Sequence, residues 1–164
     1  MDILENITLI GDPTLWFDLF IICFFLLPIH FRLFPAKNKR LLIPTLLAIV
    51  LVAFAGFAAS EVMKEALKVP RPCAGLPDCP AGYSLPSSHS TVAFSIFSLL
   101  FFMSRDAKRK HFFFIPAILV AISRVMLGVH TLDDIFLGAV TGMVVARLAL
   151  APSEMLIESY SASL

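Results

Sequence analysis

The feature that most constrains this chain is a series of apolar stretches, each about as long as a bilayer-crossing helix. Such a helix needs about 20 mostly apolar residues, because backbone polar groups in hydrocarbon must be paired within the helix. Hydrophobic residues make up 59% of the 164 residues and charged residues 15%, and the mean hydropathy is +0.88. Soluble domains carry roughly 25% charged residues. The composition therefore excludes a soluble or disordered chain and predicts one membrane domain over residues 1–164.

Five such stretches predict five transmembrane helices joined by short loops. The predicted spans are residues 15–34, 41–60, 89–103, 112–129 and 134–151. Residues 1–11 are too few to cross a bilayer, and their spaced leucine and isoleucine side chains suit a helix lying at the membrane interface. We therefore predict an all-α fold, an integral membrane helical bundle of about five transmembrane helices with a short N-terminal interfacial helix.

The distribution of lysine and arginine predicts how the bundle lies in a cell membrane. Basic residues are concentrated in the loops after the first and third predicted spans: Arg32, Lys37, Lys39, Arg40, Arg105, Lys108, Arg109 and Lys110. With five spans both loops lie on one side, which the positive-inside rule assigns to the cytoplasm. The N-terminus is then outside, the C-terminus is cytoplasmic, and the proline-rich residues 69–88 form an outer loop.

Four further basic residues lie near the outer face, where the positive-inside rule does not explain them: Lys64, Lys68, Arg71 and Arg124. A charge at membrane depth is costly and is usually functional. Lys64 and Arg71 are seven residues apart, which places both on one helix face if the helix continues to Pro70. Guanidinium groups match phosphate oxygens in pairs. These cations therefore predict a phosphate site at the outer face, while the net charge of +1 argues against a nucleic-acid partner.

Serine and histidine residues complete this predicted site. Ser87, Ser88 and His89 begin the third span, where hydroxyl groups and the free N–H groups of a helix N-terminus favour an anion. His130 and Asp134 are four residues apart, so on a helix the carboxylate contacts the imidazole and makes it more basic. Asp133, three residues from His130, is also within reach of the ring at helical spacing. This pairing suits a nucleophile, whereas His89 suits a general acid for the leaving oxygen.

Three motifs, in this order, resemble the signatures of the type-2 phosphatidic acid phosphatase superfamily. They are Lys64-x6-Arg71-Pro72, Pro86-Ser87-Ser88-His89 and Ser123-Arg124-x5-His130-x3-Asp134. The superfamily includes lipid phosphatases, bacterial acid phosphatases and vanadium haloperoxidases. Ser88 stands where the family usually has glycine. The Ser-Ser-His variant resembles the dolichyl diphosphatase branch, whereas residues 130–138 are similar to prokaryotic undecaprenyl-diphosphate and phosphatidylglycerophosphate phosphatases.

The resemblance implies how the chemistry is divided. His130 would attack phosphorus and form a phosphohistidine, Asp134 would hold its ring, and His89 would protonate the leaving group. The phosphoryl oxygens would be bound by the remaining motif residues together with His89: Lys64, Arg71, Ser87, Ser88 and Arg124. Because three cations can neutralise these oxygens, we expect no metal and no other cofactor.

The function expected first is hydrolysis of a polyprenyl diphosphate to the monophosphate by an integral membrane lipid phosphatase. Phosphatidic acid or phosphatidylglycerophosphate is the alternative substrate. A membrane transporter that binds phosphate without hydrolysis is the alternative of another class, although we find no inverted repeat typical of transporters. A structural or scaffold role is a further alternative, but it would not explain the charged cluster at the outer face. The expected partners are a lipid phosphate and membrane lipids, and the oligomeric state stays undetermined.

Several remaining residues have a simpler interpretation. Three charged residues near the outer end of the second span are interpreted as a solvated helix end without a role in the site: Glu61, Glu65 and Lys68. Cys73 and Cys79 share the outer loop, where either a disulfide or two free thiols fits the sequence. Gly138 and Gly142 form a small-xxx-small pair, which predicts a seam of close helix packing.

Overall fold

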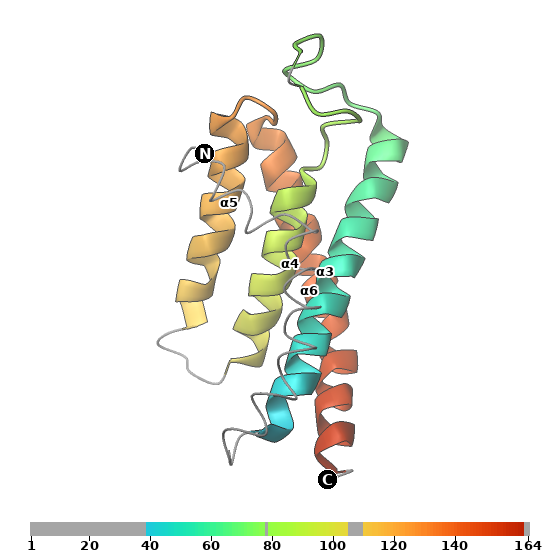
Figure 1. Cartoon of the computed structure of the whole chain (residues 1–164), viewed down its shortest axis with the longest axis vertical. Helices are drawn as coiled ribbons and strands as arrows, with labels where there is room; N and C mark the ends of the chain where they lie inside the picture. Colours follow the sequence, from blue (N-terminus) through green and yellow to red (C-terminus); the bar gives the residue numbers. More distant parts are fainter. Residues whose placement is uncertain (1–38, 78, 105–109, 163–164) are drawn as a thin grey trace.

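The described part of the chain is built from helices. The computed structural model describes residues 39–77, 79–104 and 110–162, and every regular element in these ranges is helical. The elements are α3 (Lys39–Leu67), α4 (Ser88–Met103), the 3-10 helix η1 (Lys110–Phe113), α5 (Phe114–Met126) and α6 (Leu132–Ala162), as Figure 1 shows. The all-α prediction is confirmed for these ranges. The predicted span 15–34 and the interfacial helix 1–11 lie outside the described residues.

The helix bounds differ from the predicted spans in an informative way. Helix α4 agrees within one residue, whereas α3 and α6 are longer than predicted because helical hydrogen bonding continues through charged turns at their ends. Helix α5 ends three residues early, at Met126 instead of 129. Gly128 has a φ of +69°, and its N–H donates to the carbonyl of Val125 at 2.9 Å. This left-handed glycine ends the helix.

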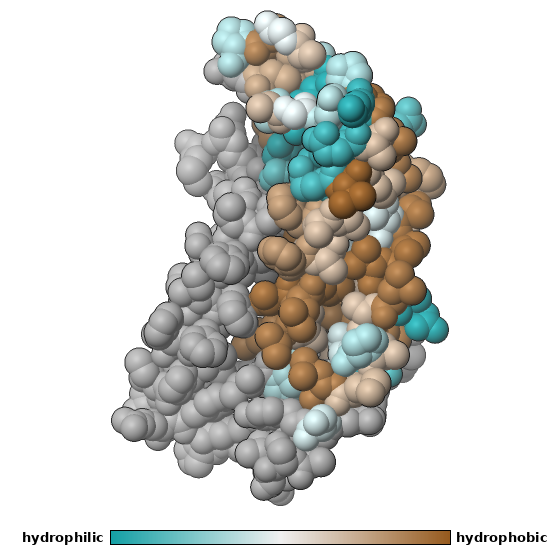
Figure 2. Space-filling model, turned by 90° about the vertical axis from the view of Figure 1, so that its right-hand side faces the viewer, coloured by the Kyte–Doolittle hydropathy of each residue, from teal (hydrophilic) through white to brown (hydrophobic). Residues whose placement is uncertain are grey.

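Two of the described helices are long and apolar enough to cross a membrane. They cover Pro44–Leu67 and Leu132–Leu156, and less than a third of the apolar window in each is buried inside the protein. Helices α4 and α5 are apolar but shorter. Large side chains point outward from three helices, including Phe54 on α3, Ile122 on α5 and Phe136 on α6. On the face shown in Figure 2, hydrophobic residues cover the length of the helices and hydrophilic residues gather mainly at one end.

Helix α4 is the centre of the bundle and packs against α3, α5 and α6 (Figure 1). Its apolar residues join two clusters, one with α3 and α6 around Ile96 and Leu99, the other with α5 around Ala93 and Val120. Helix α4 has no charged residue. Two of its buried hydroxyl groups bond to backbone carbonyls one turn earlier: Thr91 Oγ1 donates to the Ser87 carbonyl at 2.9 Å and Ser95 Oγ to the Thr91 carbonyl at 2.8 Å. A short helix without charge can therefore occupy the centre of the fold.

The predicted glycine seam is where α6 meets α4. A methyl group on Gly142 would lie 2.5 Å from the Thr91 carbonyl oxygen and 2.9 Å from the Ser95 backbone nitrogen. A methyl group on Gly138 would lie 2.9 Å from the Ser87 carbonyl oxygen. These neighbours are backbone atoms, which cannot move aside as a flexible side chain can. The glycines therefore bring the two backbones into direct contact.

Replacing Gly142 with alanine should lower the thermal stability of the protein. The added methyl group must separate α6 from α4, and overpacking of this kind costs about 1–3 kcal/mol. The measurement is the midpoint of thermal unfolding in detergent. Val144→Leu is the matched control, because it also adds one carbon to α6 but at a side chain that is 52% exposed. Equal midpoints for the two variants would contradict the close contact.

The loop between α3 and α4 is anchored at both ends. Helix α3 ends at Leu67, and Lys68 follows with a left-handed φ of +51°. The structure contains a disulfide between Cys73 and Cys79, which decides the alternative that the sequence left open. The N–H of Ser84 donates to the carbonyl of Val69 at 2.8 Å, joining the two ends of the loop. The loop thus holds Arg71 and Ser84 close to the end of the bundle.

Candidate active site

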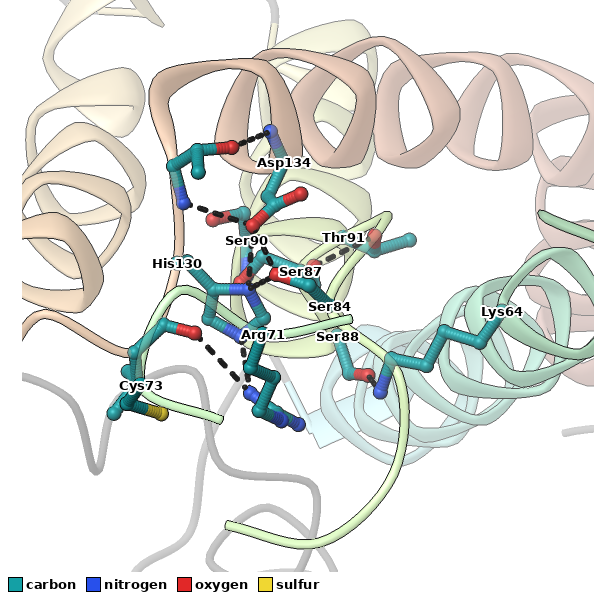
Figure 3. A network of polar contacts seen from close by, with 12 residues as sticks. Lys64, Arg71, Cys73, Ser84, Ser87, Ser88, Ser90, Thr91, His130 and Asp134 are labelled. Carbon is teal, nitrogen blue, oxygen red and sulfur yellow. Dashed lines mark hydrogen bonds and ion pairs between the residues drawn. The ribbon is translucent and has the colours of Figure 1, made fainter. Parts of the chain in front are cut away.

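The residues predicted to form the site come from every described helix and from the loops between them. Successive helices run in opposite directions, so the C-terminal ends of α3 and α5 and the N-terminal ends of α4 and α6 lie at one end of the bundle (Figure 1). This end carries all the predicted site residues: Lys64, Arg71, Ser87, Ser88, His89, Arg124, His130 and Asp134. Figure 3 shows most of them in one network of polar contacts.

His130 and Asp134 form a buried pair at the beginning of α6. The Nδ1 atom of His130 lies 3.2 Å from Oδ2 of Asp134, and each side chain is 2% exposed. The pair does not stack along a helix as the spacing predicted, because α6 begins only at Leu132 and His130 lies in the preceding turn. The contact forms because the turn folds the imidazole back over the first turn of α6.

A capping box holds the carboxylate of this pair in place. The N–H of Thr131 donates to Asp134 Oδ2 at 2.8 Å, and the N–H of Asp134 donates to Thr131 Oγ1 at 3.3 Å. Reciprocal bonds of this kind satisfy free N–H groups at the start of a helix. The sequence contains the matching Thr-x-x-Asp pattern at Thr131 and Asp134, three residues apart. The cap that starts α6 therefore also orients the carboxylate toward His130.

Arg71 determines the protonation of the imidazole. Its Nη1 atom lies 3.1 Å from His130 Nε2 and also donates to the Val129 carbonyl at 3.4 Å. Because a guanidinium group can only donate, Nε2 must be the accepting, unprotonated nitrogen. The single ring proton then sits on Nδ1, facing Asp134. Burial, followed by the charge of Arg71, lowers the pKa of His130 to about 4. The ring is therefore neutral at pH 7, with the Nε2 lone pair available for bonding.

A direct titration should show this lowered pKa. The chain has four histidines, and one of them, assigned by its loss in His130→Asn, should keep its neutral NMR signal until the pH approaches 4. Because an unfolded histidine binds its proton near pH 6.5 and the folded one only near 4, the unfolded state gains protons first. Thermal stability should therefore fall between pH 6.5 and 4. A midpoint near 6.5 for this ring would contradict its burial.

Ser84 is part of the site, although the sequence analysis did not identify it. Its hydroxyl donates to Asp134 Oδ2, lies 3.3 Å from His130 Nδ1 and is buried, the residue being 1% exposed. It comes from the loop, two residues before Pro86, so no helical spacing relates it to the other residues. Its position beside the Pro-Ser-Ser-His motif was the one available signal. Ser84 and the capping box thus hold the same carboxylate oxygen of Asp134.

Replacing Ser84 with alanine should lower kcat about 10- to 100-fold, the range for a residue that supports a reacting group, with little change in KM. Ser84→Thr keeps the hydroxyl and should restore most of the rate. Ser98→Ala is the matched control, because Ser98 is also fully buried and its hydroxyl bonds to nothing in the described residues. The measurement is steady-state hydrolysis of a lipid phosphate. An equal loss in both alanine variants would attribute the effect to packing.

The cations of the site are largely withdrawn from solvent. Lys64 is 8% exposed and Arg124 is 9% exposed, while Arg71 is partly buried. The charge of Arg124 also contributes to lowering the pKa of His130, which shows that the last turn of α5 lies near the ring. Arg71 does not continue the face of α3 as predicted, because that helix ends at Leu67 and the loop carries the guanidinium to His130. Buried cations of this kind favour an anionic ligand.

The N-terminus of α4 lies beside these cations. Ser87 caps the helix by accepting from the N–H of Ser90, and its own N–H donates to the Asp134 carbonyl at 3.0 Å. Ser88 is the first residue of α4, and its hydroxyl accepts from Lys64 Nζ at 2.5 Å. His89, in the same turn, is partly buried. Four loop residues beside Arg71 also line a cavity of about 390 Å³: Pro70, Leu76, Pro80 and Tyr83.

The described residues contain no group of three or more histidine, cysteine, aspartate or glutamate side chains able to hold a metal ion. What they bring to one end of the bundle is three cations and a helix N-terminus, near a neutral imidazole held by a carboxylate. The unprotonated Nε2 atom faces the cation Arg71, so an electrophilic phosphorus whose oxygens bind the cations would meet a nitrogen lone pair. This arrangement is chemically suited to attack on a phosphoryl group.

Comparisons with known proteins agree with this geometry. The PAP2 superfamily matches residues 42–156. The chain is 34% identical over 103 residues to Dolichyldiphosphatase 1 of Mus musculus, covering 52% of this chain and 43% of the mouse protein. It thus spans less than half the length of that relative.

Two crystal structures are similar to the whole fold. The first is a transmembrane PAP2-type phosphatidylglycerolphosphate phosphatase from Bacillus subtilis, with a TM-score of 0.69 and 25% identity, covering 93% of this chain and 76% of that one. The second is LpxE from Aquifex aeolicus, with a TM-score of 0.60 and 25% identity, covering 90% of this chain and 83% of that one. Together with the two long apolar helices, these matches identify a membrane protein.

Proposed function

The chain belongs to the PAP2 superfamily, and from that premise we propose that it is a membrane lipid phosphatase acting through a phosphohistidine on His130. The observation that carries the proposal is the placement of the His130 ring between Arg71 and Asp134. Its Nε2 atom accepts from Arg71, and its Nδ1 atom faces Asp134. A neutral imidazole in this tautomer, beside buried cations, is the arrangement that a nitrogen nucleophile needs for attack on phosphorus.

The proposed reaction has two steps. In the first, His130 Nε2 forms a bond to phosphorus, the bond from phosphorus to the leaving oxygen breaks, and His89 protonates that oxygen. Asp134 stabilises the positive charge that develops on the ring. In the second, His89 takes a proton from water, the water oxygen attacks phosphorus, and the bond to Nε2 breaks. Inorganic phosphate leaves, and both histidines return to their starting states.

The remaining site residues bind the transferred group in this proposal. The charges of Lys64, Arg71 and Arg124 would neutralise the phosphoryl oxygens as the transition state forms. Arg71 would exchange its contact with His130 for a phosphoryl oxygen, which frees the lone pair at the moment the phosphorus arrives. The N–H groups of Ser88 and His89, at the start of α4, and the Ser87 side chain would complete the cradle. No step requires a metal ion.

A polyprenyl diphosphate is the substrate that we propose first. The mouse relative is named a dolichyldiphosphatase, and the Ser87-Ser88-His89 variant of this chain resembles the dolichyl diphosphatase branch. The bundle has outward-facing apolar side chains along its length, which suit a lipid tail that approaches between helices. Phosphatidylglycerophosphate is the second candidate, because the Bacillus subtilis structure is named as its phosphatase; phosphatidic acid is the third.

A substrate panel tests the function and the substrate together. The purified full chain in detergent, with a chelator present, is expected to release phosphate from a polyprenyl diphosphate faster than from phosphatidylglycerophosphate or phosphatidic acid. Faster release from a glycerolipid would replace the first substrate with the second or third. Phosphate flux into vesicles without any hydrolysis would support the transporter alternative and reject the enzyme.

The proposed site faces the outside of the cell membrane. The support is the cluster of lysine and arginine in the two loops after the first and third predicted spans, which the positive-inside rule assigns to the cytoplasm. The site lies at the far ends of α3 and α4, the helices that adjoin these loops in the sequence. A single cysteine placed in the 69–88 loop of a variant without the three native cysteines (Cys23→Ser, Cys73→Ser and Cys79→Ser) should react with a membrane-impermeant maleimide in intact cells. Labelling only after the cells are lysed would reverse the proposed orientation.

A further inference from the structure

Glu61 lies inside the anion site, although its sequence position suggested only a solvated helix end. Its Oε1 atom accepts from Lys64 Nζ at 2.7 Å, across one turn of α3. The same oxygen accepts from the Ser88 hydroxyl at 3.0 Å, on the neighbouring helix α4. Lys64 Nζ in turn donates to Ser88 Oγ at 2.5 Å. The three side chains therefore form a closed triangle of hydrogen bonds at the edge of the site.

The directions of these bonds follow from the donors. An ammonium group can only donate, so Ser88 Oγ accepts from Lys64, and the one hydroxyl proton of Ser88 is left for Glu61. Glu61 therefore occupies one of the three N–H donors of Lys64 and the single donor of the Ser88 hydroxyl. A phosphoryl oxygen that accepts from the Ser88 hydroxyl must replace the Glu61 carboxylate there, and beside Lys64 it competes with the same carboxylate for the ammonium charge.

The exposure of the partners indicates which of them can move. The Lys64 side chain is 10% exposed, whereas the Glu61 side chain is 45% exposed, and Ser88 is 6% exposed. Lys64 and Ser88 are held by their helices and their surroundings. The carboxylate of Glu61 can rotate into solvent, where water satisfies it.

We propose that Glu61 is an internal counter-ion that competes with the phosphoryl group for Lys64 and Ser88. The inference rests on the proposed function, since it takes these two side chains as phosphate ligands. In the empty site the carboxylate neutralises one of the three cations. When a phosphoryl group arrives, Glu61 gives up both contacts, and when inorganic phosphate is ready to leave, Glu61 takes them back. The negative charge thus weakens the hold on the product.

The test is the affinity of inorganic phosphate for the full-length protein, measured by titration calorimetry in detergent. Glu61→Gln keeps an oxygen that can accept from Lys64 and Ser88 but removes the charge. Bound phosphate and the Glu61 carboxylate are both negative and compete for the same donors, so they repel each other. Without the carboxylate charge the variant should bind phosphate about tenfold more tightly. If Glu61 served only to position Lys64, its replacement would weaken phosphate binding. Unchanged or weaker binding in Glu61→Gln would overturn the proposal.

Two further variants test whether a change in phosphate affinity comes from the negative charge at position 61. Glu65→Gln removes the same charge from an exposed residue one turn later on α3, and its affinity should stay near that of the unmodified protein. Glu61→Asp keeps the charge and should not bind phosphate more tightly. If either control variant bound phosphate as tightly as Glu61→Gln does, the counter-ion role of Glu61 would be rejected.

The binding measurement does not depend on turnover, so the two proposals can fail separately. If the protein binds phosphate and responds to Glu61→Gln as expected but hydrolyses no lipid phosphate, the counter-ion role of Glu61 is supported and the enzymatic function is rejected. If it hydrolyses lipid phosphates but Glu61→Gln does not tighten phosphate binding, the enzymatic function is supported and the counter-ion role is rejected.

Discussion

Replacing His130 with alanine should reduce lipid phosphate hydrolysis by about 10⁴-fold or more, the largest effect expected of a single substitution in this protein. A nucleophile cannot be partly replaced, since without Nε2 no bond to phosphorus forms and only water attack in a binding pocket remains. The loss should appear in kcat. The anion pocket of His130→Ala keeps Lys64 and Arg124, so inorganic phosphate should still bind.

The covalent step can be followed separately from the rate. Protein quenched during turnover of a labelled substrate should carry a phosphoryl group that is stable in base and released by acid, as a phosphohistidine is. The label should be absent from His130→Ala. His111→Ala is the matched control, because His111 is exposed in η1 at the opposite end of the bundle and its loss should leave rate and labelling unchanged. Full turnover by His130→Ala would reject the mechanism.

Asp134→Asn should lower kcat about 10³- to 10⁴-fold, the scale found when a reacting histidine loses its carboxylate partner. An amide oxygen can still accept from the Thr131 N–H in the capping box, so α6 should begin at the same residue. What is lost is the negative charge that stabilises the ring once Nε2 has bonded to phosphorus. The amide can also present its NH₂ group to Nδ1, which would favour the wrong tautomer.

The matched control for this variant is Asp133→Asn. Asp133 is the neighbouring carboxylate in the first turn of α6 and is exposed, so it shares the helix position without the contact to His130. We expect its kcat to stay within about twofold of the unmodified protein, as for surface substitutions away from a reacting group. If both variants lost activity equally, the charge at the start of α6, rather than its bond to the imidazole, would be responsible.

Much of the site was predictable because its residues lie in short, ordered motifs at helix ends. Apolar length located α4 within one residue, and the serine and histidine residues at its start followed directly. The spacing of four residues correctly paired His130 with Asp134, although the structure forms the pair through a turn and a capping box instead of a helix. Local spacing predicts neighbours well when the chain connecting them is too short to separate them.

Residues that meet across the fold were not predictable in this way. Ser84 and Glu61 were not predicted: one is a loop serine whose only signal is the motif beside it, the other one of several charged residues at the end of α3. Each enters the site only because another segment arrives beside it, α6 in the case of Ser84 and α4 in the case of Glu61. Arg71 was predicted for the site, but its contact with His130, 59 residues later in the chain, was not, because it depends on the path of the loop after α3.

The amino-acid sequence alone determined that this chain is helical and apolar enough for a membrane, and that cations, serines and histidines lie at the ends of its helices. These properties depend on composition and on spacings of a few residues. Only the tertiary structure decided which nitrogen of His130 is unprotonated, which hydroxyl supports Asp134 and which carboxylate contacts Ser88. Each of these depends on a hydrogen bond between segments far apart in the chain. Such bonds form only once the helices have packed, as α4 and α6 do at Gly138 and Gly142 of α6.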